Sequence, residues 1–388
     1  MKKTSLIALL LLISICILVF SSCFSLRDGG LLFTEVEGGY QVTGISLKDR
    51  FYKNFTVEIP SEYNGKPVVA ISDNAFLGYS SLVKVTIPDT VTRIGNNAFG
   101  LCLVLSDINI PDSVTSIGDH AFTGCVLLTS IMIPDSVITI GYGAFSGCSN
   151  LSSIEIPDSV TSIGDAMFCD CTSLTSIEVD ENNEYYKSID GNLYSKDESI
   201  LVHYAIGKKE TSFTIPNSVT NIGVGAFFGC TALTSVTIPD SVTRIGESAF
   251  ASVTSLTSIA IPNSVTNIDV GSFSGCTALT SVTIPDSVTS IGESAFEGCT
   301  SLESIIIPEN VTSIGSWSFY RCASLKTITI PISVTTIERN AFEDCTLLEN
   351  IVFEGTIDEW NAIWLQANWK RNVPATEVIC SNGTVSLK

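Results

Sequence analysis

The sequence predicts a repeat solenoid, in which the chain winds into a right-handed coil of similar turns. The first observation is a proline that recurs at intervals of about 23 residues over most of the chain. The second is the alternation of apolar and polar residues before each proline, which is typical of a short strand with one buried face. The third is a hydrophobic content of 45%. A single unit of this length cannot bury its apolar side chains alone, so neighbouring units must stack.

The repeat can be followed through its prolines. They are Pro60, Pro88, Pro111, Pro134, Pro157, Pro216, Pro239, Pro262, Pro285, Pro308 and Pro331. The interval is constant except between Pro60 and Pro88 and between Pro157 and Pro216, where insertions lengthen it. A period of roughly 20–29 residues indicates the leucine-rich-repeat type of solenoid. We therefore expect 11 coils over residues 55–353, with one parallel sheet of short strands on the concave face.

One unit, Leu279–Cys299, shows how each element is expected to form. The stretch LTSVTIP alternates and predicts a strand, which Pro285 ends because it has no N–H to donate. Gly292 is expected to supply a positive φ. Glu338 occupies the equivalent position and adopts a positive φ poorly, so it predicts an altered turn. Phe296 is expected to fill the interior of the coil.

The first residues are typical of an export signal of the lipoprotein type, over residues 1–22. Lys2 and Lys3 precede an apolar stretch, Leu6–Phe20, that is shorter than the roughly 20 residues a membrane span needs. The sequence FSSC then resembles a bacterial lipobox, which implies that Cys23 carries lipid and becomes the new N-terminus. A permanent membrane anchor is the alternative.

The charge of the chain limits its partners. Twenty basic residues stand against 40 acidic ones, for a formal net charge of −20. Such a surface repels phosphate backbones and anionic membranes. We expect no nucleic-acid partner and no membrane contact beyond an N-terminal lipid.

An insert at residues 180–210 interrupts the repeat. The sequence IDGNLY predicts a hairpin turn at Asp190–Gly191, with strands near residues 185–189, 192–195 and 200–204. Aromatic residues gather there and could contact a ligand, or could cover a widened coil. The candidate binding residues are Tyr185, Tyr186, Tyr194, His203 and Tyr204.

The two ends of a solenoid must be covered, because the terminal coils would otherwise expose their cores. Residues 23–54 are expected to form a tether and an N-terminal cap, and residues 354–388 a C-terminal cap. Trp360 and Trp364 have the i, i+4 spacing of a helix, and Trp369 follows. These tryptophans could bind carbohydrate, but packing onto the last coil is the simpler interpretation.

Nothing in the sequence indicates catalysis. Nine cysteines occupy the same place in their coils, as Cys299 does after Pro285, and Val253 takes this place in one coil, so the position is interpreted as buried and apolar. Free thiols are favoured over disulfides between coils. Only two histidines occur, and neither stands in a metal-ligand or catalytic pattern. A column of aspartates after the prolines could hold Ca²⁺ but also suits turns. We expect no enzyme, no metal and no cofactor.

The outward strand positions form a hydroxyl-rich face with few charges. Serines stand four residues before most prolines and threonines two residues before many of them. Such a face can hydrogen-bond a partner but shows no anchor residue of the kind that dominates tight interfaces. A binding surface and a plain solvated face explain it equally well.

The pattern IPDSVTSIGxxAFxGCxxLxxI resembles the BspA-like, or treponemal-type, family of bacterial leucine-rich-repeat surface proteins over about residues 55–385. The insert and the C-terminal segment also resemble those of the family. The resemblance implies a protein tethered in the cell envelope at the bacterial surface, which adheres to host extracellular or plasma proteins or to other cells. The alternative is a carbohydrate-binding module that uses the insert or the tryptophan-bearing cap.

Overall fold

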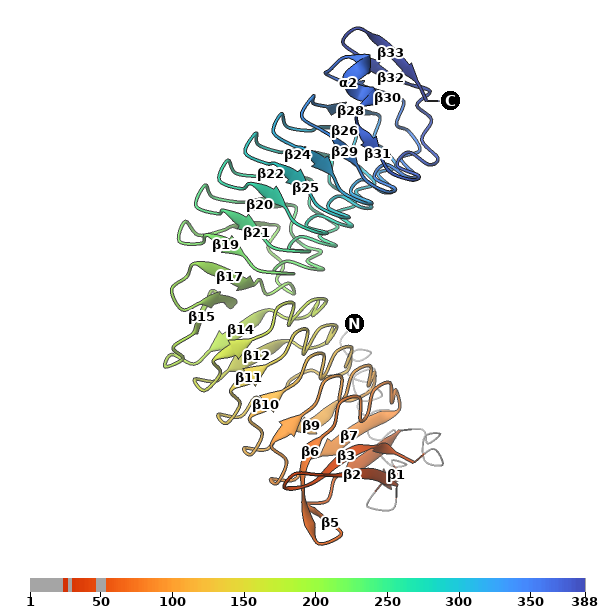
Figure 1. Ribbon diagram of the computed structural model, residues 1–388. Helices are drawn as coiled ribbons and strands as arrows, with labels where there is room; N and C mark the ends of the chain where they lie inside the picture. The colour runs from red at the N-terminus through yellow and green to blue at the C-terminus, as the bar shows by residue number, and fades with distance from the viewer. Residues whose placement is uncertain (1–23, 27–29, 47–53, 388) are drawn as a thin grey trace, which may run out of the picture. The chain divides into compact units, whose positions relative to one another are not determined.

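The structure is a computed structural model, and it describes residues 24–26, 30–46 and 54–387. The proposed signal peptide and Cys23 lie outside the described residues. The chain forms two compact units, Met1–Met167 and Phe168–Lys388. Each unit is a stack of coils in which the strands of successive coils lie side by side (Figure 1). The predicted leucine-rich-repeat solenoid with parallel strands is confirmed.

Unit 1 contains two parallel ladders, one on each side of the prolines. The first ladder consists of β1 (Phe24–Leu26), β4 (Phe55–Glu58), β7 (Leu82–Thr86) and β9 (Asp107–Asn109). The second consists of β6 (Lys66–Ile71), β8 (Arg93–Ile94), β10 (Ser116–Ile117), β11 (Thr139–Ile140) and β13 (Ser162–Ile163). The hairpin of β2 (Leu31–Val36) and β3 (Gly39–Ile45) extends the second ladder, with β3 parallel to β6. The remaining strands are β5 (Glu62–Tyr63) and β12 (Ser153–Ile156).

Unit 2 repeats this arrangement. Its first set of strands is β14 (Ser176–Val179), β18 (Ser212–Thr214), β20 (Ser235–Thr237), β22 (Ser258–Ala260), β24 (Ser281–Thr283), β26 (Ser304–Ile306), β28 (Thr327–Ile330), β30 (Asn350–Phe353), β32 (Glu377–Cys380) and β33 (Gly383–Ser386), of which β18 to β28 each precede a proline of the repeat. Those after the prolines are β19 (Asn221–Ile222), β21 (Arg244–Ile245), β23 (Asn267–Ile268), β25 (Ser290–Ile291), β27 (Ser313–Ile314), β29 (Thr336–Ile337) and β31 (Trp364–Leu365). A short helix, α2 (Ile357–Asn361), precedes β31.

The structure adds two features to the predicted coil. Each coil carries a second short strand after its proline, in addition to the one strand that the sequence pattern predicted. The number of turns is about 14 rather than 11. The difference arises because the N-terminal segment, the insert and the C-terminal segment each wind a further turn. Their strands β3, β17 (Ile200–His203) and β31 pair in parallel with β6, β19 and β29.

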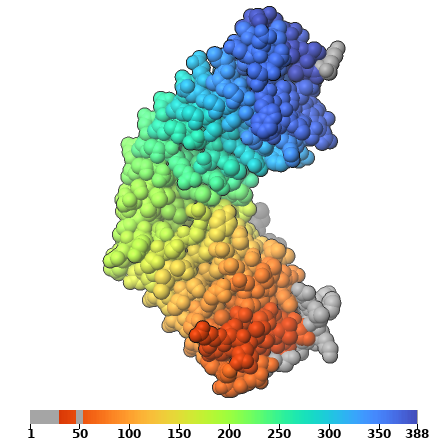
Figure 2. Space-filling model, viewed as in Figure 1, coloured from red at the N-terminus to blue at the C-terminus, as the bar shows by residue number. Residues whose placement is uncertain are grey.

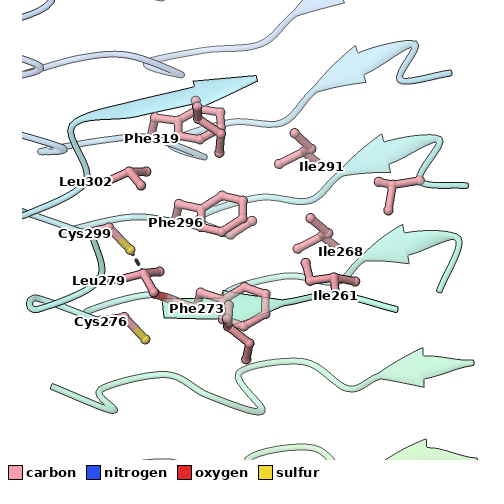
Figure 3. Packing of buried hydrophobic residues seen from close by; sticks show 14 of the residues in the cluster. Ile261, Ile268, Phe273, Cys276, Leu279, Ile291, Phe296, Cys299, Leu302 and Phe319 are labelled. Atoms are coloured by element: carbon pink, nitrogen blue, oxygen red, sulfur yellow. Dashed lines mark hydrogen bonds between the residues drawn. The ribbon is translucent and has the colours of Figure 1, made fainter. Parts of the chain in front are cut away.

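The interior of each unit is a column of stacked rings. In unit 2 the phenylalanines of successive coils, from Phe227 to Phe342, lie with ring centroids 4.8–5.5 Å apart and nearly parallel planes. Figure 3 shows Phe273, Phe296 and Phe319 stacked in this way, with the cysteines and leucines beside them. Phe76 to Phe145 form the same column in unit 1. The predicted core position of Phe296 is therefore confirmed, and the ring is fully buried.

Each coil contacts its sequence neighbours, so the space-filling view shows bands of colour that follow the order of the chain within each unit (Figure 2). In the part of the chain that the structure describes, no helix has the length and apolarity of a membrane span.

The repeated glycine has a different role from the predicted one. Gly292 does not adopt a positive φ, and the left-handed residues of this coil are Ser294 and Gly298, with φ angles of 53° and 68°. A Cβ on Gly292 would lie 2.8 Å from the Ile268 carbonyl oxygen. Glycine is thus favoured at position 292 because neighbouring coils approach closely here. The altered turn expected at Glu338 is absent, since its N–H donates to the Ile314 carbonyl as Gly315 donates to Ile291.

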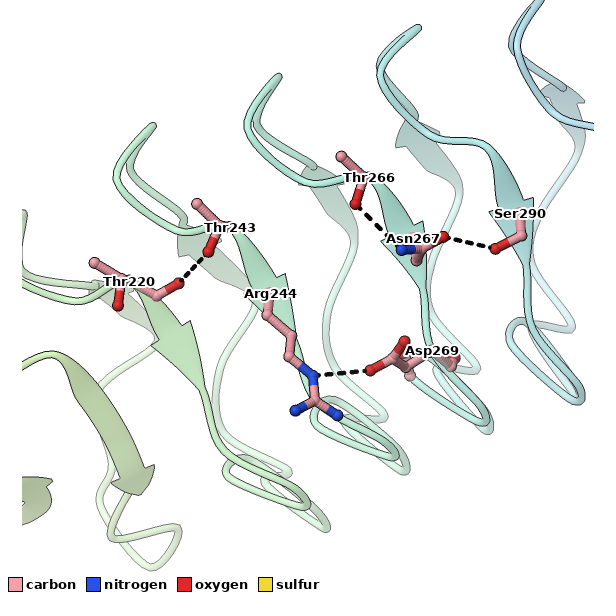
Figure 4. Close-up of polar contacts among 8 residues, drawn as sticks. Thr220, Thr243, Arg244, Thr266, Asn267, Asp269 and Ser290 are labelled. Atoms are coloured by element: carbon pink, nitrogen blue, oxygen red, sulfur yellow. Dashed lines mark hydrogen bonds and ion pairs between the residues drawn. The ribbon is translucent and has the colours of Figure 1, made fainter.

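Hydroxyl groups bond the coils to one another, which explains much of the serine and threonine content. The Thr243 hydroxyl donates to the Thr220 carbonyl of the preceding coil at 3.3 Å (Figure 4). Ser287 donates to the Val265 carbonyl at 2.6 Å in another column. Equivalent bonds recur in both units. These side chains therefore satisfy backbone carbonyls along the stack.

Phe296→Ala should lower the free energy of unfolding by about 3–5 kcal/mol, because it removes a buried ring from the middle of the column. Chemical denaturation of the purified chain measures the change. Ser281→Ala, at an exposed outward position, is the control and should change stability by less than about 0.5 kcal/mol. A loss below about 1 kcal/mol for Phe296→Ala would show that the ring is not part of the core.

Candidate functional site

The insert forms the three predicted strands, β15 (Tyr186–Ile189), β16 (Asn192–Ser195) and β17. Asp190 and Gly191 both have positive φ angles, of 50° and 70°, and make the expected hairpin turn. β15 and β16 pair antiparallel, as do β16 and β17. Because β17 also pairs in parallel with β19, the insert continues the second ladder of unit 2.

The five candidate binding residues of the insert do not share one surface. Tyr194, His203 and Tyr204 are buried, and Tyr186 is half-buried. Tyr204 takes the place of a column phenylalanine, with its ring 5.2 Å from that of Phe227. Only Tyr185 among the five is exposed, at 50%. This arrangement favours the interpretation that the aromatic residues fill a widened coil.

His203 is held neutral inside the insert. Its Nε2 accepts a hydrogen bond from the Phe168 backbone N–H at 3.3 Å, and the two rings meet edge to face. Its Nδ1 is buried without a hydrogen-bond partner among the described residues. Burial lowers the pKa of His203 to about 4. A neutral imidazole that is buried in this way is not in a position to contact a ligand.

The C-terminal segment uses two of its three tryptophans as a cap. Trp360 and Trp369 are buried against Phe353 and Phe342, with their own ring centroids 5.9 Å apart. The expected helical pairing of Trp360 with Trp364 is wrong, because α2 ends at Asn361. Trp364 lies in β31 opposite Thr336 and is 66% exposed. A carbohydrate site built from all three rings is therefore not formed.

The cysteine column is structural in character. No disulfide joins the cysteines in the described residues, and all of them are buried. Most donate from Sγ to the carbonyl of the phenylalanine 26 residues earlier, as Cys299 does to Phe273 at 3.2 Å. Burial raises the pKa of Cys276 to about 12. Since the thiolate is the nucleophile, these side chains are unsuited to covalent catalysis.

The most continuous exposed surface of unit 2 is the outer face of the strands before the prolines. We call it the outer face; it consists of two rows that run in register across each of two sheets, one from β18 to β24 and the other from β26 to β32. One row contains Ser212, Ser235, Ser258, Ser281, Ser304, Thr327, Asn350 and Glu377. The other contains Thr214, Thr237, Ala260, Thr283, Ile306, Thr329, Val352 and Ile379. Only Glu377, at one end, is charged.

The second row contains an apolar anchor that the sequence analysis missed. Ile306 is 72% exposed, and the row continues through Val352 to the exposed Ile379. The signal was available, because coil 302–308 reads LESIIIP where its neighbour reads LTSVTIP. Ile306 was not singled out because the neighbouring coils have threonine at this position. An exposed isoleucine among hydroxyl groups is suited to contact a partner surface.

The corresponding strands of unit 1 carry charges instead. Lys84 and Asp107 form an ion pair at 2.6 Å, and Glu58 and Glu155 also stand at outward positions. No group of three or more His, Cys, Asp and Glu side chains that could hold a metal ion occurs within the described ranges. Outward positions without charge therefore run from β18 to β30 of unit 2, between Glu178 on β14 and Glu377 on β32.

A family model described as BspA type Leucine rich repeat region matches the chain in six copies. The matches cover residues 69–200, 204–289 and 271–366, which together make up most of the two stacks. No curated protein matches the sequence significantly.

Solved structures with the same fold come from several bacteria. A leucine-rich repeat protein from Eubacterium ventriosum is 26% identical, with a TM-score of 0.74, 90% of this chain and 94% of that chain being covered. A leucine rich cell surface protein from Faecalibacterium prausnitzii is 31% identical, with a TM-score of 0.54 and coverages of 87% and 97%. The pneumococcal vaccine antigen PcpA, at 22% identity and a TM-score of 0.63 over 92% and 98%, shares the fold.

The buried thiols should resist alkylation in the native chain and react after unfolding. Burial raises the pKa of the thiols of Cys148 and Cys345 to about 12, so little thiolate forms there at neutral pH. Mass spectrometry after iodoacetamide treatment, with and without denaturant and without reductant, measures the reactive number. If fewer than half of the thiols react in denaturant, the free-thiol assignment is wrong.

His203 should make the stability of the insert depend on pH. Its pKa is about 4 when folded and near 6.5 in an unfolded chain, so the unfolded state binds the proton first as pH falls. The stabilisation is complete above pH 6.5 and is lost towards pH 4, by at most roughly 3 kcal/mol. Denaturation at several pH values should show this slope. His203→Leu should remove it, and an unchanged slope would refute the assignment.

Proposed function

The chain belongs to the BspA-type leucine-rich repeat family, and from that premise we propose that it is an exported surface protein that adheres to another protein through its outer face. The repeat solenoid serves as a scaffold for protein interaction. The observation that carries the proposal is the uncharged outer face of unit 2 on a chain of net charge −20. An acidic surface repels most acidic proteins. A neutral strip with exposed aliphatic residues provides a place where such a partner could approach.

The energetics of the outer face support a protein contact. Interfaces depend on a few buried apolar side chains surrounded by polar groups that exclude water. Ile306 offers the apolar side chain, with Thr329 beside it in register. The neighbouring serine row supplies hydroxyl groups that can donate or accept. Because the strands that carry them are fixed by the stacked core, little ordering free energy is lost on binding.

Display outside the cell is the second part of the proposal. The residues that support it are the Lys2–Lys3 start, the apolar stretch after it and the FSSC sequence at Cys23. The related protein from F. prausnitzii is described as a cell surface protein. Lipid on Cys23 would tether the chain to the bacterial envelope directly before β1, which pairs with β4.

The proposed partners are host extracellular-matrix or plasma proteins, or proteins on other cells. A binding screen of the purified chain against matrix proteins, plasma proteins and glycans tests this directly. At least one protein should bind at micromolar concentration. If none binds while circular dichroism shows an intact fold, the adhesion proposal fails.

Ile306→Glu should weaken binding to the partner found in this screen by about 30-fold, because it places a charge at the centre of the apolar row. Glu155 occupies the equivalent position of a coil in unit 1, so the fold accepts the residue. Val270→Glu is the matched control, since Val270 is also exposed and its neighbouring coils carry Glu247 and Glu293 there. Surface plasmon resonance compares the three chains. If the two variants lose affinity for the partner equally, the outer face is not the binding surface.

A further inference from the structure

A polar groove crosses the second ladder of unit 1. It has a volume of about 400 Å³ and is lined by residues of four successive coils. One wall is the in-register row of Arg93, Ser116, Thr139 and Ser162 on β8, β10, β11 and β13. The other wall is formed by Asn96, Asp119 and Tyr142. The groove lies wholly within unit 1 and does not involve the outer face.

The bottom of the groove is lined by glycines, which have no side chain to fill it. Gly118, Gly141 and Gly164 lie between the two walls. A Cβ on Gly141 would stand 2.4 Å from the Asp119 backbone nitrogen, and one on Gly164 would stand 2.3 Å from that of Tyr142. A side chain at Gly141 or Gly164 would therefore require the neighbouring coil to shift. The groove remains open because the residues between its two walls are glycines.

The polar wall is held rigid by a ladder of side-chain bonds. Asn96 Oδ1 accepts the Asp119 backbone N–H at 2.9 Å, and Asp119 Oδ1 accepts that of Tyr142 at 2.8 Å. These bonds use one oxygen of each side chain. The amide NH₂ of Asn96 and the second carboxylate oxygen of Asp119 take no part in the ladder. A ligand would find a donor and an acceptor already fixed in place.

The two ends of the groove differ in chemistry. At one end the Arg93 guanidinium is paired with Asp73 at 2.8 Å and keeps further N–H groups in its planar fork. At the other end Tyr142 stands where the two preceding coils have Asn96 and Asp119, and its side chain is 46% exposed. The ring meets that of His120 edge to face, with centroids 5.2 Å apart. The groove thus joins an aromatic surface to a row of fixed donors and acceptors.

These features exclude several classes of ligand. The positive charge of Arg93 is balanced by the negative charges of Asp73 and Asp119, so the groove has no excess positive charge to bind a phosphate or sulfate. The carboxylates are too few for a metal site, and no such cluster was found among the residues described. A peptide strand cannot add to the sheet here, because β8, β10 and β11 are each paired on both sides. The lining also lacks the apolar pockets that hold peptide side chains.

We propose that this groove binds a neutral, extended oligosaccharide. Sugar rings present an apolar face that stacks on an aromatic ring and hydroxyl groups that both donate and accept. Tyr142 supplies the stacking surface, while Asp119, Asn96 and Arg93 supply planar hydrogen-bonding groups. Successive coils lie about 4.8 Å apart, close to the length that one residue adds to an extended β-linked chain. Ser116, Thr139 and Ser162 can therefore each meet one sugar residue in turn.

This site is independent of the proposed protein adhesion. Isothermal titration of the purified full-length chain with cellohexaose, the fully N-acetylated chitohexaose and maltohexaose tests it. At least one of the two β-linked hexasaccharides should bind with a Kd at or below about 1 mM. The α-linked maltohexaose, which coils, should bind at least about tenfold more weakly. Equal binding of all three would refute the requirement for an extended chain.

Two substitutions locate the site. Tyr142→Ala removes the stacking surface, and Thr139→Tyr fills the groove from an exposed strand position that accepts an aromatic residue. Each should weaken binding at least about tenfold. Leu347→Ala removes an equally exposed apolar side chain from unit 2 and should leave binding unchanged. Circular dichroism should be the same for all chains. The proposal is overturned if neither β-linked hexasaccharide binds, or if binding survives either substitution.

Discussion

The structure depends on one constraint, which is that every coil must share its interior with the coils beside it. A single coil is too short to enclose a phenylalanine ring. The ring of Phe296 is buried because Phe273 and Phe319 lie 5.4 Å away on either side. The close approach of the backbones follows from this stacking, as does the glycine at position 292. The hydroxyl bonds, such as that from Thr243 to Thr220, then satisfy carbonyl groups that the stack would otherwise leave with one partner.

This constraint divides each coil into residues that hold its shape and residues that are free to recognise a partner. Inward positions repeat because each must fit the same neighbours. Outward positions on the strands carry no such requirement, so departures from the repeat mark places where function can be sought. Ile306 and Tyr142 are two such departures, one on each unit. Both stand on strands or turns whose backbone is fixed by the column beneath them, which gives a rigid site without a dedicated cavity.

The sequence predicted the inside of the molecule better than its surface. Period and alternation were enough to place Phe296, the cysteine column and the strands of the insert, because burial imposes the same residue types on every coil. The roles of Gly292 and Trp364 could not be predicted, since they depend on distances between coils that the pattern does not contain. Trp364 lies in β31 and not in the helix, because β31 pairs with β29 of the preceding turn. The groove beside Tyr142 was missed because its walls come from different coils.

The shared interior also determines the hydrogen bonding and the reactivity of the thiols in the cysteine column. The sequence indicated an apolar position, since Val253 can replace cysteine there. The structure adds that the thiol donates a second hydrogen bond to a carbonyl that already accepts a backbone N–H, as Phe273 does from Cys276 and Cys299. Valine keeps the packing and loses this bond. Cysteine is therefore favoured as a small apolar residue with a weak donor, and the burial that provides the bond also removes the reactivity of the thiol.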